Sequence, residues 1–536
     1  MSAMIRNFIT VALLLCSVNG FAADFYVSAS GSGGNGTSGN PWSPAEIVWT
    51  TVDNEESTVY LMSGTYTGNL SIANATANRI YIRPCSYASG SCPEGSDGIV
   101  LFQRAAPADP AVPGITINIA GNNITIDGST TSENHTRNVK IIPGNNYGIV
   151  FSTGKTGNVV TYIEITGMAD EKTPAECSAG QCQVIAIYAG DAGNENEISY
   201  NYLHGNWGHC DAQLATQTTA YGGLLFHHNT IETGTLNYLC GTGKGVDVYS
   251  NTLDITDAIT PYDMIHFYNE GLTNIRVYKN TIIADDTQAI FLENPAASST
   301  STENIRIYDN IVRCGTATCY MGIAVHQSSS NPIIDGVLND VVIANNTFVG
   351  ASELNFTTFL RFYTGTGSTT TYTNLKVVNN IFYNIDNPVS VSAGVTWANE
   401  ADAIFNGNLI YHASAFSFQW LDDDLSEAKA YANLTVFEAD HPTYADNAIG
   451  NPSFAGANDF HLNTPTSPAY NAGLDLSGYI DMPVSWPDDK DSTPRPQGAV
   501  WDIGAYEFRN TLRGVYNTKG ISGYYNANGL VGTVLN

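Results

Sequence analysis

The chain has 536 residues, of which 43% are hydrophobic, and 50 Asp and Glu against 21 Lys and Arg give a net charge of -29. This charge disfavours nucleic acid and anionic membrane surfaces as partners, because both repel an acidic protein. The apolar content is sufficient for a folded core. A chain of this length would ordinarily form several domains, unless it is a repeat protein whose core grows in one dimension.

Residues 1–22 have the pattern of an export signal. Arg6 precedes the apolar run FITVALLL (8–15), and small residues allow cleavage after Ala22. The remaining chain has no apolar stretch long enough to cross a membrane as a helix. We therefore expect a secreted monomer in an extracellular, periplasmic or cell-surface location.

The cysteines fit an oxidising compartment. Nine cysteines, less Cys16 in the export signal, leave eight in the mature chain. Their spacing suggests short loops closed by Cys85–Cys92, Cys177–Cys182 and Cys314–Cys319, and a bridge between neighbouring coils formed by Cys210–Cys240. Other pairings are allowed, and the sequence does not choose among them. No CxxC or HxxxH spacing occurs, so we expect no zinc site.

A phrase of alternating apolar residues followed by Asn recurs through the middle of the chain, as in NIRVYKNTI (274–282) and NIRIYDNIV (304–312). Period-two alternation of Ile, Val, Tyr and Phe predicts strands, and the recurrence predicts a solenoid with variable loops. Asn suits its tight bends because it bonds to nearby backbone and tolerates left-handed conformations. Stacked amides could also bond from coil to coil. The predicted ladder consists of Asn201, Asn229, Asn251, Asn280, Asn310, Asn346, Asn380 and Asn408.

Both ends of the mature chain carry recognisable segments. FYVSASGSGGNGTSGNPWSP (25–44) and TVYLMSGTYTGNLSI (58–72) resemble the start of secreted proteins of the pectate-lyase-like right-handed β-helix superfamily. Residues 451–476 and PRPQGAVWDIGAYEF (494–508) resemble the C-terminal segment called choice-of-anchor Q. The resemblance implies an all-β, right-handed parallel β-helix with an N-terminal cap and an irregular C-terminal closing segment. The superfamily includes lyases, glycosidases, epimerases and adhesins, so the resemblance leaves the activity open.

The predicted organisation follows the chain. It comprises a signal peptide (1–22), an N-terminal cap with the first coils (23–120), regular coils (121–415), a closing segment that ends the rod (416–508), and a tail without an assigned role (509–536).

Four consecutive predicted strands, within residues 264–270, 289–295, 322–328 and 359–365, carry polar and aromatic residues on one face. Strict alternation gives two outward columns. One column contains Tyr268, Glu293, His326 and Tyr363, and the other contains His266, Phe291, Ala324 and Arg361. Neighbouring coils lie about 4.8 Å apart, so Glu293 should reach both Tyr268 and His326. Such a face could form one wall of a substrate groove.

These residue types suit the cleavage of a uronate polymer by β-elimination. The reaction needs a base, a group that neutralises the uronate carboxylate, and an acid for the leaving oxygen. His326 or Tyr268 could be the base, Arg361 could hold the carboxylate, and Tyr363 could be the acid. His266, Phe291 and Asn294 would bind substrate. In a hydrolase, Glu293 would instead need a second carboxylate across the bond.

A function without catalysis also fits the sequence. Aromatic faces pack on sugar rings while polar neighbours bond their hydroxyls, so the same face could belong to a noncatalytic surface or matrix protein that binds glycans or cells. No cofactor is required by either hypothesis. Residues 487–496 contain several carboxylates that could bind calcium, although a solvated loop is the favoured interpretation of this stretch.

Overall fold

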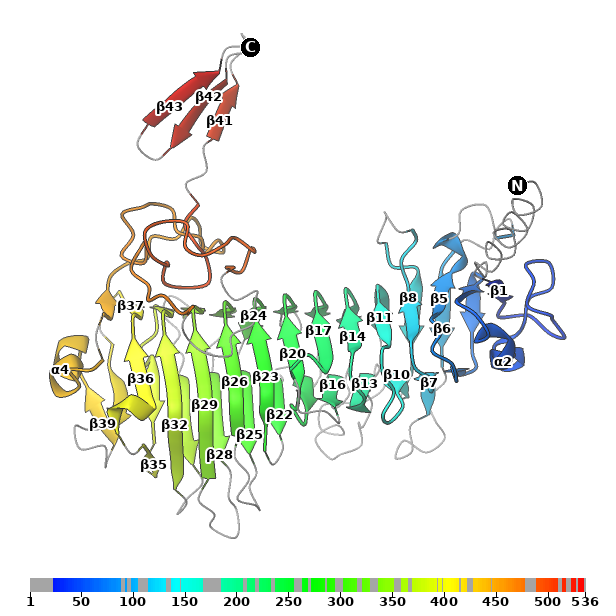
Figure 1. Ribbon diagram of the computed structural model, residues 1–536, viewed down its shortest axis with the longest axis horizontal. Coiled ribbons are helices and arrows are strands. Elements are labelled where there is room, and N and C mark those ends of the chain that lie inside the picture. Colours follow the sequence, from blue (N-terminus) through cyan, green and yellow to red (C-terminus); the bar gives the residue numbers. More distant parts are fainter. Residues whose placement is uncertain are drawn as a thin grey trace, which may run out of the picture.

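A computed structural model forms a long rod of stacked coils (Figure 1). It describes residues 23–509 together with 513–516, 522–526 and 529–534. Within the first range the following residues are not described: 88–91, 94–97, 105–113, 132–135, 145, 167–184, 206–209, 217–220, 233–236, 255–262, 269–270, 285–286, 295–301, 316–320, 328–335, 351–357, 365–368, 393, 398, 414–415, 422–427, 445 and 478–487. The side chains of Cys210, Asn294 and His326 are also outside the description, as is the predicted signal peptide.

Three long sheets run along the rod, and every neighbouring pair of strands in them is parallel. Sheet 1 contains β1 (Ala23–Val27), β2 (Ser57–Leu61), β5 (Ile80–Pro84), β8 (Ile124–Asp127), β11 (Val159–Thr161), β14 (Asn196–Ser199), β17 (Leu224–His227), β20 (Val246–Tyr249), β23 (Thr273–Tyr278), β26 (Thr302–Tyr308), β29 (Gly336–Ala344), β32 (Thr370–Val378), β35 (Val395–Thr396) and β36 (Ala403–Asn406). Sheet 2 contains β4 (Leu70–Ile72), β7 (Ile115–Ile119), β10 (Tyr147–Phe151), β13 (Ile185–Ala192), β16 (Cys210–Thr216), β19 (Asn237–Gly241), β22 (Asp263–Tyr268), β25 (Gln288–Asn294), β28 (Met321–Gln327), β31 (Thr358–Thr364) and β34 (Val389–Val391). Sheet 3 contains β3 (Gly64–Tyr66), β6 (Val100–Gln103), β9 (Val139–Ile142), β12 (Ile163–Thr166), β15 (Tyr202–His204), β18 (Thr230–Glu232), β21 (Thr252–Asp254), β24 (Thr281–Ala284), β27 (Ile311–Cys314), β30 (Thr347–Val349), β33 (Ile381–Tyr383), β37 (Leu409–Tyr411) and β40 (Ala448–Ile449).

Each regular coil contributes one strand to each sheet in turn. The chain passes from β22 in sheet 2 to β23 in sheet 1 and β24 in sheet 3, and then returns to sheet 2 as β25. Strands that are adjacent in a sheet therefore come from successive coils. This winding confirms the predicted all-β, right-handed parallel β-helix.

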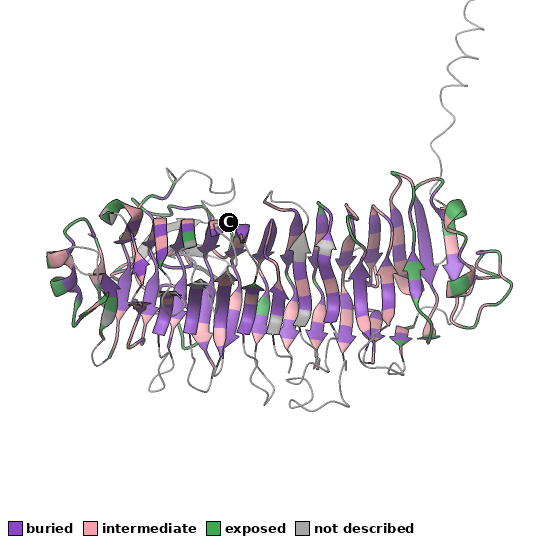
Figure 2. Ribbon diagram, turned by 90° about the horizontal axis from the view of Figure 1, so that it is seen from below, coloured by how far each residue is buried: buried purple, intermediate pink, exposed green. Residues whose placement is uncertain are grey.

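The core fills the inside of the coils. Alternation is regular in sheet 1, where Ile275 and Val277 of β23 are buried while Arg276 and Tyr278 point outward. Most of the buried apolar residues belong to one cluster that runs from Val27 to Tyr444, and Figure 2 shows buried residues in purple along the strands of the rod. Each fully buried apolar side chain contributes about 1.5–3 kcal/mol relative to exposure, so stacking coils supplies most of the stability.

The eight asparagines of the repeated phrase form a ladder at the corner between sheets 1 and 3. Each is at most 1% exposed. From Asn201 to Asn380, the backbone and side-chain N–H groups of each asparagine donate to Oδ1 of the next, at 2.9–3.1 Å. Asn408 makes the same two bonds to Asn447, which the sequence analysis missed. The ladder satisfies polar groups that would be costly to bury unpaired.

We expected the ladder asparagine to adopt the left-handed conformation at this corner. The residue before it does so instead. Positive φ values between 52° and 64° occur at Tyr200, His228, Ser250, Lys279, Asp309, Asn345, Asn379 and Gly407. The asparagine itself stabilises the bend by bonding inward and along the rod. A left-handed conformation costs most non-glycine residues about 1–2 kcal/mol, which the ladder bonds and the packing offset.

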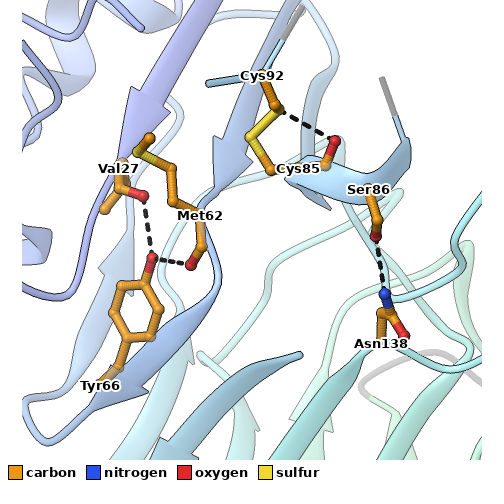
Figure 3. The surroundings of a disulfide bond; sticks show 7 residues. All are labelled: Val27, Met62, Tyr66, Cys85, Ser86, Cys92 and Asn138. Carbon is orange, nitrogen blue, oxygen red and sulfur yellow. Dashed lines mark hydrogen bonds between the residues drawn. A yellow bond between two sulfur atoms is a disulfide. The ribbon is translucent and has the colours of Figure 1, made fainter. Parts of the chain in front are cut away.

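The first coils are tied together around a disulfide (Figure 3). Cys85 and Cys92 are bonded, which confirms that predicted pair. Nearby, the Tyr66 hydroxyl donates to the carbonyls of Val27 and Met62 at 2.9 and 2.8 Å. These contacts join the chain start to the following coil. Short helical turns η1 (Pro44–Glu46), α2 (Trp49–Val52) and η2 (Cys85–Tyr87) also belong to this end.

The other predicted disulfides are only partly within the description. Cys240 and Cys314 are each disulfide-bonded. Their predicted partners, the Cys210 side chain and Cys319, lie outside the described residues, and so does the whole Cys177–Cys182 pair.

The closing segment has two parts. The hairpin of β38 (Phe418–Leu421) and β39 (Ala428–Tyr431), followed by α4 (Leu434–Asp440), places Trp420, Tyr431 and Phe437 against the end of the core, close to the last short turn, η4 (Glu400–Asp402). Residues 446–477 and 488–509 lie back along the coils, where the Ala505 N–H donates to Thr347 and Arg495 pairs with Asp309. Only the first part therefore covers the end of the rod.

Beyond the closing segment, β41 (Arg513–Tyr516), β42 (Ser522–Asn526) and β43 (Gly529–Val534) form a small antiparallel sheet within the predicted tail. In the part of the chain that the structure describes, no helix is long and apolar enough to cross a membrane.

Candidate functional site

The strand register of sheet 2 produces the two outward columns expected from the sequence. Tyr268 pairs with Glu293, Glu293 with His326, and His326 with Tyr363. In the second column, His266 pairs with Phe291, Phe291 with Ala324, and Ala324 with Arg361. Strands β22, β25, β28 and β31 thus bring all these residues onto four adjacent coils.

Sheet 2 also has a third outward row, which the sequence analysis missed. Two successive residues near the start of β22, β25 and β31 are buried in the core, as with Met264 and Ile265 or Phe359 and Leu360. This break in alternation turns the preceding residue outward, so Asp263 lies on the same face as His266. The register extends the row through Gln288, Met321 and Thr358. Adjacent apolar residues at the start of β22, β25 and β31 are the sequence signal for this break.

The missed Asp263 completes a carboxylate–imidazole–carboxylate arrangement. His266 Nδ1 lies 3.2 Å from Asp263 Oδ2, and His266 Nε2 lies 3.2 Å from Glu293 Oε2. Burial alone would lower the pKa of His266, but its hydrogen bonds and charge interactions with the two carboxylates outweigh burial and raise the pKa to about 9. His266 is therefore a cation at neutral pH, which rules it out as a resting base. Its ring also stacks on Phe291, with centroids 4.7 Å apart.

Arg361 stands apart from these carboxylates. Its guanidinium carbon lies 4.5 Å from the ring centroid of Tyr363, and Nη1 lies 3.9 Å from the Met321 sulfur. Among the described residues, none forms an ion pair with Arg361. Phe291, Met321 and Ala324 make a small apolar cluster on this outer face, with Tyr363 packed against it. Arg361 therefore packs against this cluster, and no described carboxylate pairs with its charge.

The remaining predicted residues differ in what can be said of them. Tyr268 is 51% exposed and contacts the edge of the His266 ring, with centroids 5.9 Å apart. The backbones of His326 and Asn294 lie in β28 and β25, one coil apart, while their side chains are outside the described set. The structure therefore brings Tyr268, Glu293, His266, Phe291, Arg361 and Tyr363 together on one face.

Among the described residues, two buried oxygens of the third row have no hydrogen-bond partner. They are Asp263 Oδ1 and Gln288 Oε1, which belong to residues paired across β22 and β25. Buried acceptors of this kind are costly unless water or a ligand reaches them. Their position beside His266 and Glu293 marks the same part of the face as polar and incompletely satisfied.

Metal binding has no clear centre in the described residues. No group of three or more His, Cys, Asp or Glu residues there has an arrangement that could hold a metal ion. In the acidic stretch that left calcium open, Asp489 Oδ1 instead accepts hydrogen bonds from the backbone N–H groups of Asp491 and Thr493, at 2.9 and 2.7 Å. Asp491 lies 3.0 Å from His461 Nε2. These carboxylates therefore order the closing segment.

The architecture defines the class of protein as a right-handed parallel β-helix. No family model and no curated relative matches the chain, so the resemblance of residues 451–508 to choice-of-anchor Q stays a prediction. Among solved structures the chain is similar to pectate lyase Pel9A, with 12% identity, a TM-score of 0.37, and coverage of 91% of this chain and 98% of that one.

Two further similarities have the same character. One is to XylC in complex with xylose, with 12% identity, a TM-score of 0.39, and coverage of 81% and 87% of the two chains. The other is to the PL6 family alginate lyase AlyGC, with 14% identity, a TM-score of 0.41, and coverage of 77% of this chain and 56% of that one. The substrates in these names belong to those proteins.

Proposed function

We propose that this protein is a secreted enzyme that cleaves an extracellular, uronate-containing polysaccharide by β-elimination on the outer face of sheet 2. The observation that carries the proposal is Arg361, a cation that has no ion-pair partner among the described residues. It is held against Tyr363, one coil from the strand that carries His326. In a protein with a net charge of -29, an uncompensated cation of this kind is a local site for an anionic group.

The reaction assigns one task to each group. Arg361 binds the uronate carboxylate and stabilises the charge that develops when the neighbouring C5–H bond breaks. The base, His326 or Tyr268, takes that proton, and its electron pair becomes the C4–C5 double bond. The C4–O bond then breaks, and Tyr363 protonates the leaving oxygen. Protonated His266, together with Phe291, fixes the floor beneath the sugar and leaves the proton transfer to its neighbours.

The test is an incubation of the purified mature protein with pectin, alginate, glycosaminoglycans and neutral polysaccharides. Ultraviolet absorbance reports unsaturated uronate ends, and a separate assay reports new reducing ends. We expect both signals to rise on one anionic polymer. Reducing ends alone would mean hydrolysis and would transfer the central role to Glu293.

Two variants test the residue assignments. Arg361→Ala should lower kcat by about 100-fold to 1,000-fold, the usual effect of removing one group that stabilises transition-state charge. His326→Ala should abolish turnover if His326 is the base. The matched control is Arg313→Ala, on the outer side of sheet 3, which should keep full activity. Full activity in both test variants would contradict the assignments.

The same experiment distinguishes catalytic cleavage from glycan binding without catalysis. If the folded protein binds an anionic polymer saturably, but yields no product with calcium supplied, the face of sheet 2 is a binding surface. Arg361→Ala would then weaken binding, and cleavage would be excluded.

A further inference from the structure

A separate cavity of about 310 Å³ lies between sheet 3 and the closing segment. Its floor is the outer side of β30 and β33, at Val349 and Tyr383, and its opposite wall comes from residues 451–460. Tyr383 and Phe454 meet edge to face with centroids 5.2 Å apart, and Phe454 meets Phe460 in the same way at 5.3 Å. The cavity is thus lined by three aromatic rings.

Backbone hydrogen bonds hold the outer wall in place without a ligand. Ala455 N–H donates to the His461 carbonyl at 2.9 Å, and Asn463 N–H donates to the Ser453 carbonyl at 2.9 Å. Gly456 and Asp459 close the tip of this hairpin-like loop through a reciprocal pair of bonds. A preformed, concave site that combines aromatic rings with polar groups can bind a small ligand.

The polar groups in the cavity are hydrogen-bonding but uncharged. The polar residues that line it are Tyr383, Ser453 and Asn451. Asn451 Oδ1 accepts from Ser453 N–H at 2.8 Å, while no described residue bonds to its NH₂ group or to the Tyr383 hydroxyl. The cavity therefore offers at least one free amide donor and one free hydroxyl beside aromatic surfaces.

None of the residues that line the cavity carries a positive charge that could bind an acidic ligand. In the closing segment, Asp459 and Asp491 both contact the imidazole of His461, and Arg509 lies 3.9 Å from Asp491. No lysine or arginine lines the cavity. A volume of 310 Å³ is at the lower end of the range of about 300–1,000 Å³ for small-molecule sites, so it suits a single ring.

We infer that this cavity is a binding subsite for one neutral sugar unit, either a free monosaccharide or a residue of a glycan chain. An apolar face of the pyranose packs on the aromatic lining, and its hydroxyls bond to Asn451 and Tyr383. The site lies on sheet 3, so it is separate from the face of sheet 2 and does not depend on cleavage there. It would hold a glycan on a second side of the rod.

Titration calorimetry of the full mature protein with D-glucose, D-galactose, D-xylose, N-acetylglucosamine and D-galacturonate tests the inference. We expect saturable binding of at least one neutral sugar and none of galacturonate. Ala457→Trp should abolish this binding by filling the cavity from its exposed rim. Ala455→Trp is the matched control, because Ala455 is also exposed but does not line the cavity. Tyr383→Phe should weaken binding by about threefold to tenfold through loss of one hydrogen bond.

Two results would overturn the inference. One is the absence of saturable binding by every neutral sugar at about 100 mM, a concentration that detects affinities weaker than millimolar. The other is binding that survives Ala457→Trp or is selective for galacturonate. Arg361→Ala serves as a cross-check, since it should leave neutral-sugar binding unchanged whether or not it affects polymer cleavage.

Discussion

The corner between sheets 1 and 3 and the outer face of sheet 2 differ in how completely their polar groups are hydrogen-bonded. At the corner, each asparagine amide donates and accepts along the rod, and the ladder is almost completely shielded from water. On sheet 2, Arg361 has no ion-pair partner among the described residues, and Tyr268 is half exposed. Asp263 Oδ1 and Gln288 Oε1 have no hydrogen bond from any described residue.

The polar groups of the corner therefore stabilise the fold, whereas some on the face of sheet 2 are available to bind a ligand. A network that is satisfied internally stabilises the coils but has nothing left for a ligand. An incompletely satisfied face costs stability, and its residues are therefore the better candidates for function. The variants below should separate the two regions by which property changes, stability or ligand recognition.

The largest loss of stability should come from Arg495→Met, on the closing segment that covers the corner. Arg495 bonds to Asp309 at 2.9 Å and to Glu507 at 2.8 Å, and all three side chains are at most 1% exposed. Removing the cation leaves buried carboxylates uncompensated, which should cost about 3–5 kcal/mol. Denaturant unfolding measures the loss. Lys429→Met, which breaks a more exposed pair with Asp440, should cost no more than about 1 kcal/mol.

Breaking the ladder itself should cost slightly less. Asn310 Oδ1 accepts two bonds from Asn280, and its NH₂ group donates to Asn346 Oδ1 and to the Val277 carbonyl. Asn310→Ala strands several buried groups, so we expect a loss of about 2–4 kcal/mol in the free energy of unfolding. Asn463→Ala, at an exposed position, should change it by less than about 0.5 kcal/mol. Equal effects of the two would contradict a stabilising ladder.

The two regions should also respond to pH with opposite signs. The folded pKa of His266 is about 9 against an unfolded value of 6.5, so its stabilising contribution is complete below pH 6.5 and is lost as the pH rises to about 9. Allowing for partial exposure, the loss should be about 1–2 kcal/mol. The difference in unfolding free energy between wild type and His266→Gln, measured at several pH values, isolates this contribution. A difference that does not vary with pH would contradict it.

Lys490, beneath the closing segment, provides the contrasting case. Burial lowers its pKa to about 8, despite the attraction of Asp491 and Asp309. Between pH 8 and 10.5 the unfolded state binds more protons than the folded state, so this group makes the protein more stable as the pH rises. Lys490→Met should remove that rise in the unfolding curves, while His266→Gln should leave it in place.

The smallest expected effect is on Tyr268. Because its side chain is 51% exposed, Tyr268→Ala should change the free energy of unfolding by less than about 0.5 kcal/mol. It should nevertheless weaken binding of an anionic polymer by about threefold to tenfold, through loss of aromatic contact. Unchanged affinity would place Tyr268 outside the binding surface.

The fold could be predicted because its signal is repeated. Alternating apolar residues before each Asn indicate strands, and their recurrence indicates a solenoid. The register of Glu293 with Tyr268 and His326 follows from aligning inward residues alone. Asp263 could not be placed by that method, since it depends on a break in alternation between Met264 and Ile265. The repeat pattern did not identify Asn447 as part of the ladder, because the hairpin and α4 separate it from Asn408 by more residues than a usual coil contains.

The cavity beside Tyr383 could not be inferred from the sequence either. It needs residues 451–460 to fold back on β30 and β33, a contact between segments with no shared pattern. The return of the closing segment along the rod has the same origin. It depends on pairs such as Arg495 with Asp309, whose partners are far apart in the chain.

The left-handed residues that precede the ladder asparagines recur once per coil along one edge of the rod. Their backbone conformation is nearly the same at every coil, although the side chains range from Tyr200 and His228 to Lys279. Because successive coils are about 4.8 Å apart, side chains substituted along this edge would stand at regular, known intervals. At Tyr200, His228 and Ser250, which are at least partly exposed, chemical groups could therefore be attached at successive coils, whereas Asp309, Asn345 and Asn379 are buried, and Asp309 and Asn379 hold the closing segment.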